Sequence, residues 1–249
     1  MATWPFMRAE PALLSWSGGK DSALALHTLH TEAAPSARVE ALITTITDGY
    51  ERISMHGVRR DLLRAQADAL GLPLVEVRIP PKSSNEQYER AMREGLSAFR
   101  AKGISRVVFG DLFLEDVRAY RERLLASIGM TAVLPLWGRD TARLAEEFIE
   151  LGFRAVLVCV DPRQVSPALC GLEFDRALLS ELPTGADPCG ERGEFHTFVY
   201  DGPTFDRAID IERGEMVERD GFWFCDLEAR SSDRVQTTRA GGVSNQERA

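Results

Sequence analysis

Two segments hold most of the side chains that could do chemistry, and the first is residues 17–22, Ser-Gly-Gly-Lys-Asp-Ser. Adjacent glycines let a backbone approach a phosphate closely, while backbone N–H groups, an ammonium and hydroxyls all donate to an anion. The spacing is not that of a Walker A loop, because no glycine lies five residues before Gly19 and an aspartate follows Lys20. The segment predicts a phosphate-binding loop of another kind.

The second segment, residues 187–197, is dense in reactive side chains separated by glycines: Asp187, Cys189, Glu191, Glu194 and His196. Carboxylates can bind a cation, and a neutral histidine can accept a proton, so the segment suits acid–base work. The alternative is an acidic, solvated loop whose histidine merely begins a strand. Sequence chemistry alone leaves both interpretations open.

The elements around the first segment support a binding site. An apolar run over 12–16 predicts a buried strand, and Ala23, Leu24, Leu26 and Leu29 predict a helix directly after the loop. A strand, a glycine turn and a helix together aim N–H groups and a positive helix end at an anion. The first segment therefore has the setting that a phosphate loop needs.

Further strands at 39–47, 74–79, 104–109 and 131–136 alternate with helices. This alternation predicts an α/β fold with a Rossmann-like parallel five-stranded sheet and helices on both faces. Ligands of such sheets bind beyond the carboxyl ends of the strands, where residues 17–22, 45–48 and 110–111 would meet. After Trp137 the pattern changes, which predicts a smaller mixed α+β domain. We expect domains at 1–137 and 138–228, and a polar disordered tail at 229–249.

The bulk composition narrows the class of protein. The net charge of −8 gives no basic excess for a nucleic acid, and no apolar run reaches the length of a membrane span. The start of the chain lacks the pattern of a signal peptide. Four cysteines occur without a CxxC pair, which fits reduced thiols and offers no zinc or iron–sulfur site. We expect a cytoplasmic protein that binds neither membrane nor nucleic acid.

Both segments resemble known motifs. Residues 17–22 match the SGG-x-DS signature of the PP-loop ATP pyrophosphatases, which have a HUP-type sheet. The run DPCGERGEFHTFVYDGPTF resembles the GE-x-GE-[FY]-HT segment of the diphthine–ammonia ligase family, a branch of that superfamily. Gly110-Asp111, the arginine-rich helix after it and Leu134-Pro135-Leu136-Trp137 are similar to the same family in the same order. The resemblance extends over residues 12–228.

The resemblance implies an ATP-dependent ligase that adenylates a carboxylate, releases pyrophosphate and lets ammonia displace AMP. ATP and Mg²⁺ would be cofactors, and ammonium and a carboxylate, diphthine on an elongation factor or a related acid, would be substrates; a homodimer is a further expectation. The nucleotide would contact Ser15, Ser17, Gly18, Gly19, Lys20, Asp21, Ser22, Thr45, His56, Gly110 and Asp111. Asp21 and Asp111 would contact magnesium. The expected catalytic residues are Lys20, Asp21, Glu191, Glu194 and His196.

Two other functions remain open. A PP-loop thiolase or tRNA-modifying enzyme would use Cys189, although sulfur insertion usually needs paired cysteines and tRNA needs a basic face. A non-catalytic sensor of adenine nucleotides would bind ATP without turnover, and the intact Lys20 and Asp21 count against it.

Overall fold

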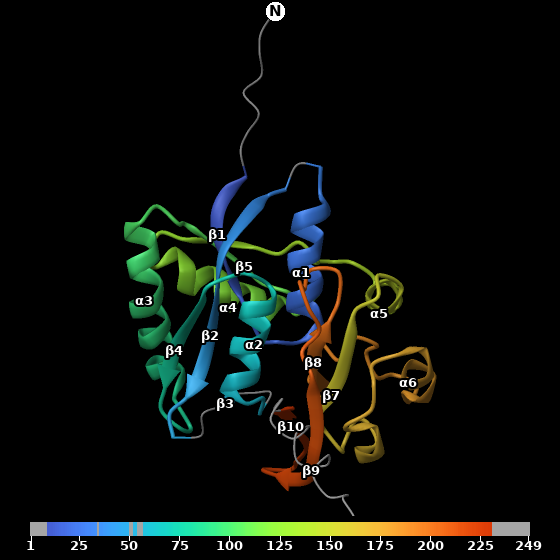
Figure 1. The fold of residues 1–249 in the computed structure, drawn as a ribbon. Helices are drawn as coiled ribbons and strands as arrows, with labels where there is room; N and C mark the ends of the chain where they lie inside the picture. The colour runs from blue at the N-terminus through green and yellow to red at the C-terminus, as the bar shows by residue number, and fades with distance from the viewer. Residues whose placement is uncertain (1–8, 34, 50–51, 54–56, 231–249) are drawn as a thin grey trace, which may run out of the picture.

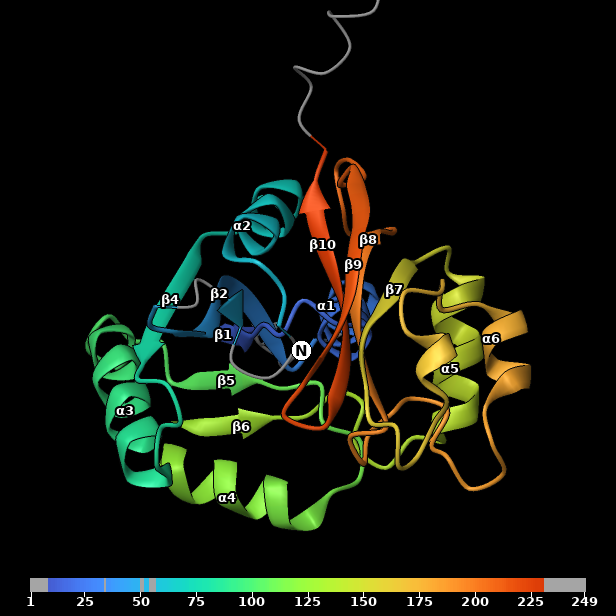
Figure 2. The same ribbon diagram turned by 90° about the horizontal axis from the view of Figure 1, so that it is seen from below.

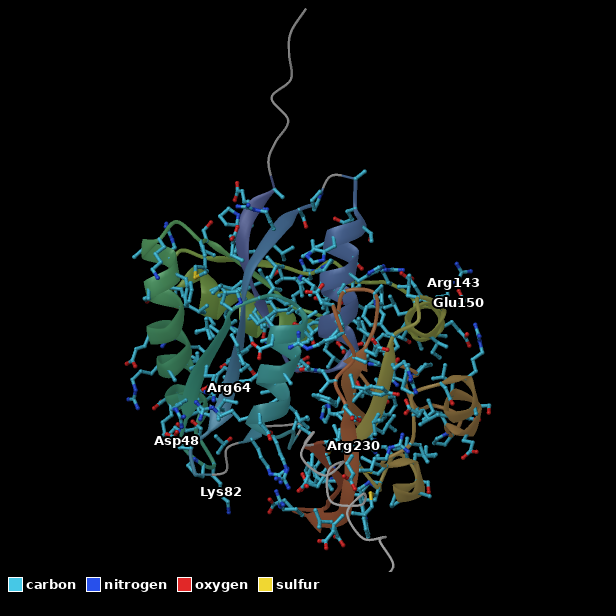
Figure 3. All side chains as sticks on the ribbon, viewed as in Figure 1. Asp48, Arg64, Lys82, Arg143, Glu150 and Arg230 are labelled. Atoms are coloured by element: carbon cyan, nitrogen blue, oxygen red, sulfur yellow. The ribbon has the colours of Figure 1, made fainter. Side chains whose placement is uncertain are left out.

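A computed structural model describes residues 9–33, 35–49, 52–53 and 57–230 of the protein. These residues form two β-sheets, here called sheet A and sheet B, with helices packed on them (Figure 1). Charged side chains such as Asp48, Arg64 and Glu150 project from the outside of the molecule (Figure 3). No helix in the described ranges is long and apolar enough to cross a membrane.

Sheet A contains five parallel strands in the order β4-β2-β1-β5-β6. Their bounds are Leu74–Ile79, Ala37–Thr47, Glu10–Ser15, Arg106–Val108 and Thr131–Val133. A two-residue strand, β3 (Arg52–Ile53), pairs antiparallel with the end of β2. The predicted five-stranded parallel sheet is confirmed. Strand β6 ends earlier than the predicted 131–136, since Pro135 cannot donate to a strand ladder.

The two faces of sheet A are covered by different helices (Figure 2). Leu13 packs with α3 (Asn85–Ala101) and α4 (Glu115–Ala126). Its neighbour Leu14 packs with α1 (Lys20–Thr31) and α2 (Arg60–Ala69), because successive side chains of a strand point to opposite faces. The chain order reverses between β1 and β5, so a crevice opens at their carboxyl ends.

Sheet B is antiparallel, with strands in the order β8-β7-β10-β9. In that order the bounds are Phe195–Asp201, Arg154–Val160, Phe222–Ala229 and Ile211–Arg219. Helices α5 (Thr141–Glu150) and α6 (Arg176–Glu181) and the short 3₁₀ helix η1 (Pro167–Leu169) complete this part. In β9, Gly214 and Glu215 together oppose Asp226, which makes a β-bulge. The expected mixed α+β region after residue 137 is thereby confirmed.

One apolar core joins the two sheets. It runs from Leu14 on β1 through Leu26 on α1 to Phe148, Leu157 and Phe198 in the C-terminal part. Helix α1 contacts both β1 and β8, so it is sandwiched between the sheets (Figure 2). The boundary at 137/138 remains a prediction. Of the expected tail at 229–249, residues 231–249 lie outside the described part of the chain.

Candidate active site

A cavity of about 420 Å³ lies at the carboxyl ends of β1, β2 and β5, beside β8 and the loop before it. Eleven of the expected nucleotide-contacting and catalytic residues line it: Ser15, Ser17, Gly19, Lys20, Asp21, Ser22, Thr45, Gly110, Asp111, Glu191 and His196. Gly18 and Glu194 are not among its lining residues. The expected contact His56 lies outside the described residues. Two segments separated by about 170 residues of sequence, 17–22 and 187–197, thus face one space.

The loop over residues 17–19 connects β1 to α1, with Gly19 as the N-cap of the helix and no side-chain cap. Ser17 Oγ accepts a hydrogen bond from Gly19 N at 3.2 Å and lies 3.2 Å from Ser22 Oγ. Lys20 N donates to Thr197 Oγ1 at 3.0 Å, which ties the start of α1 to β8. The positive end of α1 and two hydroxyls therefore meet at the cavity, an arrangement that suits an anion.

Gly110 brings the loop after β5 against the beginning of α1. A Cβ at this position would lie 2.7 Å from the carbonyl carbon and oxygen of Asp21 and 2.9 Å from Ser22 N. All three are backbone atoms, which cannot rotate away. Only glycine fits here without moving one of the two segments.

Lys20 is 3 % exposed, although it lines the cavity. Its Nζ lies 2.8 Å from both carboxylate oxygens of Asp21 and donates to the carbonyl of Cys189. Burial alone would lower the pKa of Lys20, but Asp21, followed by Cys189 and Glu191, raises it above its ordinary value. The ammonium therefore stays charged and holds the loop that bears Cys189 against the loop of residues 17–22.

Three acidic side chains, Asp21, Asp111 and Glu191, share the cavity. Asp111 lies 2.6 Å from Arg121 Nε, and Glu191 Oε1 accepts a hydrogen bond from Leu112 N at 2.8 Å. Burial raises the pKa of Glu191 to about 7; the Leu112 hydrogen bond and Lys20 oppose this, and Asp21 and Asp111 add to it. A carboxyl group with this pKa can take up or release a proton near neutral pH.

Magnesium needs oxygen ligands, and Asp21 and Asp111 both offer carboxylates to the cavity. Within the described ranges, no group of three or more His, Cys, Asp or Glu side chains is placed to hold a metal ion. Mg²⁺ is often held by one or two carboxylates together with the phosphates of a substrate. The donor set therefore fits a metal that arrives with a nucleotide.

Glu194 builds the loop that carries Glu191. It is 1 % exposed, and its Oε1 and Oε2 accept hydrogen bonds from Asp187 N at 2.8 Å and Arg192 N at 2.9 Å. Asp187 in turn accepts from Cys189 N at 2.9 Å and from Glu191 N at 3.3 Å. Two buried carboxylates thus fix the loop backbone, and the position of Glu194 favours positioning over contact with a substrate.

His196 lies on β8 and lines the cavity. Burial, together with the nearby Lys20 ammonium, lowers its pKa to about 4. The imidazole is therefore neutral at physiological pH, and a neutral imidazole carries one donor and one acceptor.

Cys189 is 3 % exposed, and its Sγ donates to the carbonyl of Thr141 at 3.3 Å. Burial raises the pKa of this thiol to about 12, although Lys20 opposes the rise. The thiol is therefore protonated at neutral pH, and a thiolate nucleophile is absent from this position.

Sequence reasoning did not single out several residues at this site, of which Thr197 and Tyr88 line the cavity. The hydroxyl of Thr197 accepts a hydrogen bond from Lys20 N. Its position directly after His196 was the sequence signal that could have identified it. Tyr88 lies on α3, where its spacing indicates only a packed helix face. Arg121 lies on α4, the arginine-rich helix that follows Gly110-Asp111 in the sequence, and it forms an ion pair with Asp111.

Residues 11–132 match the family described as diphthamide synthase N-terminal domain, and residues 140–233 match the diphthamide synthase C-terminal domain. A Schizosaccharomyces pombe protein named diphthine–ammonia ligase is 25% identical over 234 residues, which is 86% of this chain and 38% of that protein.

Animal proteins with the same name are also similar. The Danio rerio protein is 28% identical over 167 residues, covering 61% of this chain and 65% of the relative. The Homo sapiens protein is 26% identical over 190 residues, covering 68% and 67%. The chain thus spans well under half of the yeast relative and about two thirds of the animal ones.

Proposed function

Because the chain belongs to the diphthamide synthase family, we propose that it is an ATP-dependent, AMP-forming amide ligase. It adenylates a carboxylate, diphthine or a related acid, and transfers ammonia to the activated carbon, releasing AMP and pyrophosphate. The observation that carries the proposal is that residues 17–22 and the segment with Glu191 and His196 line one and the same cavity. A nucleotide and a second reactant can meet there.

ATP would bind with its β- and γ-phosphates at residues 17–22. The start of α1 and the Ser17 hydroxyl supply donors, and the charged Lys20 balances the phosphates. The Ser22 hydroxyl donates to the Gly19 carbonyl at 2.9 Å and so supports the loop from within. Asp21 and Asp111 would hold Mg²⁺, which offsets phosphate charge when bound. Gly18 acts through its backbone, and Thr45 and Ser15 line the wall toward the rest of the nucleotide.

The reaction has two steps. A carboxylate oxygen of the acid attacks the α-phosphorus, the bond from that phosphorus to the bridging oxygen breaks, and pyrophosphate leaves. The nitrogen of ammonia then attacks the acyl carbon and AMP leaves, so that one proton must be taken from the nitrogen. Glu191 lines the cavity, and burial raises its pKa to about 7, which supports a role in accepting this proton; its negative form would attract ammonium.

The roles of His196 and Glu194 differ from that of Glu191. Neutral His196 orients the acid or the ammonia by hydrogen bonding rather than by accepting a proton, since a base with a pKa of about 4 is weak. Glu194 positions the loop from inside the protein.

The other functions receive less support. A thiolase role requires a reactive sulfur, and the buried, protonated Cys189 does not supply one. A pure sensor gives no reason for a carboxyl group with a pKa near neutrality beside the phosphate loop. The homodimer and the cytoplasmic location stay predictions from the sequence.

Pyrophosphate and AMP release would test the proposal, with ATP, Mg²⁺ and NH₄⁺ present. Diphthine-bearing elongation factor is compared with a metabolite extract and with no added acid. Turnover that occurs only with the modified factor supports the full proposal. Turnover that occurs only with the extract supports the amide-ligase reaction but excludes diphthine as the substrate. Asp21→Asn should abolish release, whereas Glu150→Gln on the outer surface of α5 should leave it unchanged. ATP binding without AMP formation under any condition would favour the sensor.

A further inference from the structure

Gln66 is a wholly buried polar side chain on α2, outside both motifs. Its Oε1 accepts a hydrogen bond from Trp16 Nε1 at 2.8 Å. Its Nε2 donates to the carbonyl of Gly18 at 2.9 Å and to the carbonyl of Val199 at 2.6 Å. One carboxamide therefore touches the end of β1, the phosphate loop and strand β8.

The partners fix the orientation of this amide. An indole N–H can only donate and a backbone carbonyl can only accept, so the oxygen must face Trp16 and the nitrogen must face Gly18 and Val199. A carboxylate would lack both donors, and a lysine or arginine would lack the acceptor. Among side chains of this length, only glutamine satisfies all three partners.

The backbone of the phosphate loop packs closely against this amide. Gly18 has φ +78°, and a Cβ there would lie 2.8 Å from Gln66 Oε1. The Gly18 carbonyl also accepts a hydrogen bond from Val199 N at 2.9 Å. The first glycine of the loop is thus joined to the strand that carries His196 and Thr197, two residues of the cavity wall.

We propose that Gln66 is a positioning residue that holds the phosphate loop in register with β8, so that the nucleotide-binding residues and the second reactive segment keep one geometry. The inference rests on the proposed function, because it assumes that residues 17–22 bind the nucleotide. A helix outside the cavity would then determine ATP affinity through hydrogen bonds alone.

The test uses three variants. Gln66→Met keeps the length and loses every hydrogen bond, while Gln66→Glu keeps the acceptor and, when protonated, one donor. Leu62→Ala is the control, because Leu62 is buried on the same helix and no hydrogen bond of the loop depends on its side chain. Binding of α,β-methylene ATP, which the ligase cannot cleave at the α-phosphorus, is measured by calorimetry on the folded protein of residues 1–249.

The Gln66→Met protein should bind the analogue at least about tenfold more weakly than the unaltered protein. The affinity of Gln66→Glu should lie between the two, and it should fall further as rising pH ionises the new carboxyl group. Leu62→Ala should melt at a lower temperature and bind the analogue like the unaltered protein. Equal affinity in the Gln66→Met, Gln66→Glu and unaltered proteins would overturn the inference, as would an equal loss in Leu62→Ala. If Gln66→Met does not fold, the pH dependence of Gln66→Glu decides.

Amide exchange separates this inference from the proposed function. Loss of Gln66 should speed exchange of the Val199 and Lys20 N–H groups, which bond to Gly18 and Thr197, and should shift the Trp16 indole resonance. If the unaltered protein binds no ATP analogue, the proposed function fails. The exchange rates and the Trp16 resonance then still test whether Gln66 holds residues 17–19 in register with β8. Unchanged Val199 exchange in Gln66→Met would then overturn the inference.

Discussion

Replacing Gly110 by alanine should damage the site more than the fold. The new Cβ would lie 2.7 Å from the Asp21 carbonyl, so the loop after β5 and the start of α1 must separate by about 0.8 Å or more to reach ordinary packing distance. Overpacking of this kind costs about 1–3 kcal/mol of unfolding free energy. Both displaced segments carry expected magnesium contacts, Asp111 and Asp21.

A displacement of this size at reacting groups lowers turnover by roughly tenfold to a hundredfold. The assay is pyrophosphate release at saturating ATP, measured together with a urea unfolding curve for each protein. Gly95→Ala is the matched control, because its Cβ would lie 2.8 Å from Val77 Cγ2, a side-chain atom away from the phosphate loop. It should keep the turnover of the unaltered protein. Unaltered turnover in Gly110→Ala would refute the reasoning, as would an equal loss in Gly95→Ala.

Three more outcomes are expected. Cys189→Ser should keep its turnover, because the thiol is protonated; a large loss in kcat/KM would point to sulfur chemistry. Turnover should rise as pH increases through about 7, where Glu191 loses its proton, and a pH–rate profile of Glu191→Gln should lack that limb. The folded-state pKa of His196 is about 4, below the ordinary 6.5, so the unfolded chain binds a proton more readily than the folded protein. The stability is therefore complete above about pH 6.5. Stability should fall by up to roughly 3 kcal/mol as pH drops from 6.5 to 4, and urea unfolding of His196→Phe should show a shallower pH dependence.

Much of the fold could be predicted because its signals are local. The apolar runs at 39–47 and 74–79 correspond to β2 and β4, and the glycine turn after β1 lies where the sheet order reverses. Buried parallel strands need nearly continuous apolar sequence, which a single chain displays directly.

The contacts within the site could not be predicted in the same way. Glu191 and Glu194 are three residues apart and equivalent in type, yet one lines the cavity and the other is buried against backbone N–H groups. Lys20 meets the Cys189 carbonyl, and Gln66 meets Val199, across long separations in sequence. Backbone partners of this kind leave no mark in residue type or spacing, so only the folded chain reveals them.

The bulge in β9 has a consequence for self-association. This strand is an edge of sheet B, and an open edge can act as a template on which a strand of another molecule adds. Where Gly214 and Glu215 together oppose Asp226, the regular spacing of N–H and C=O groups is interrupted, and exposed charges such as Glu212 and Arg219 flank the interruption. A second chain would have to reproduce the bulge and bury those charges. This edge therefore disfavours the addition of a strand from a second molecule, and a homodimer would have to form through another surface.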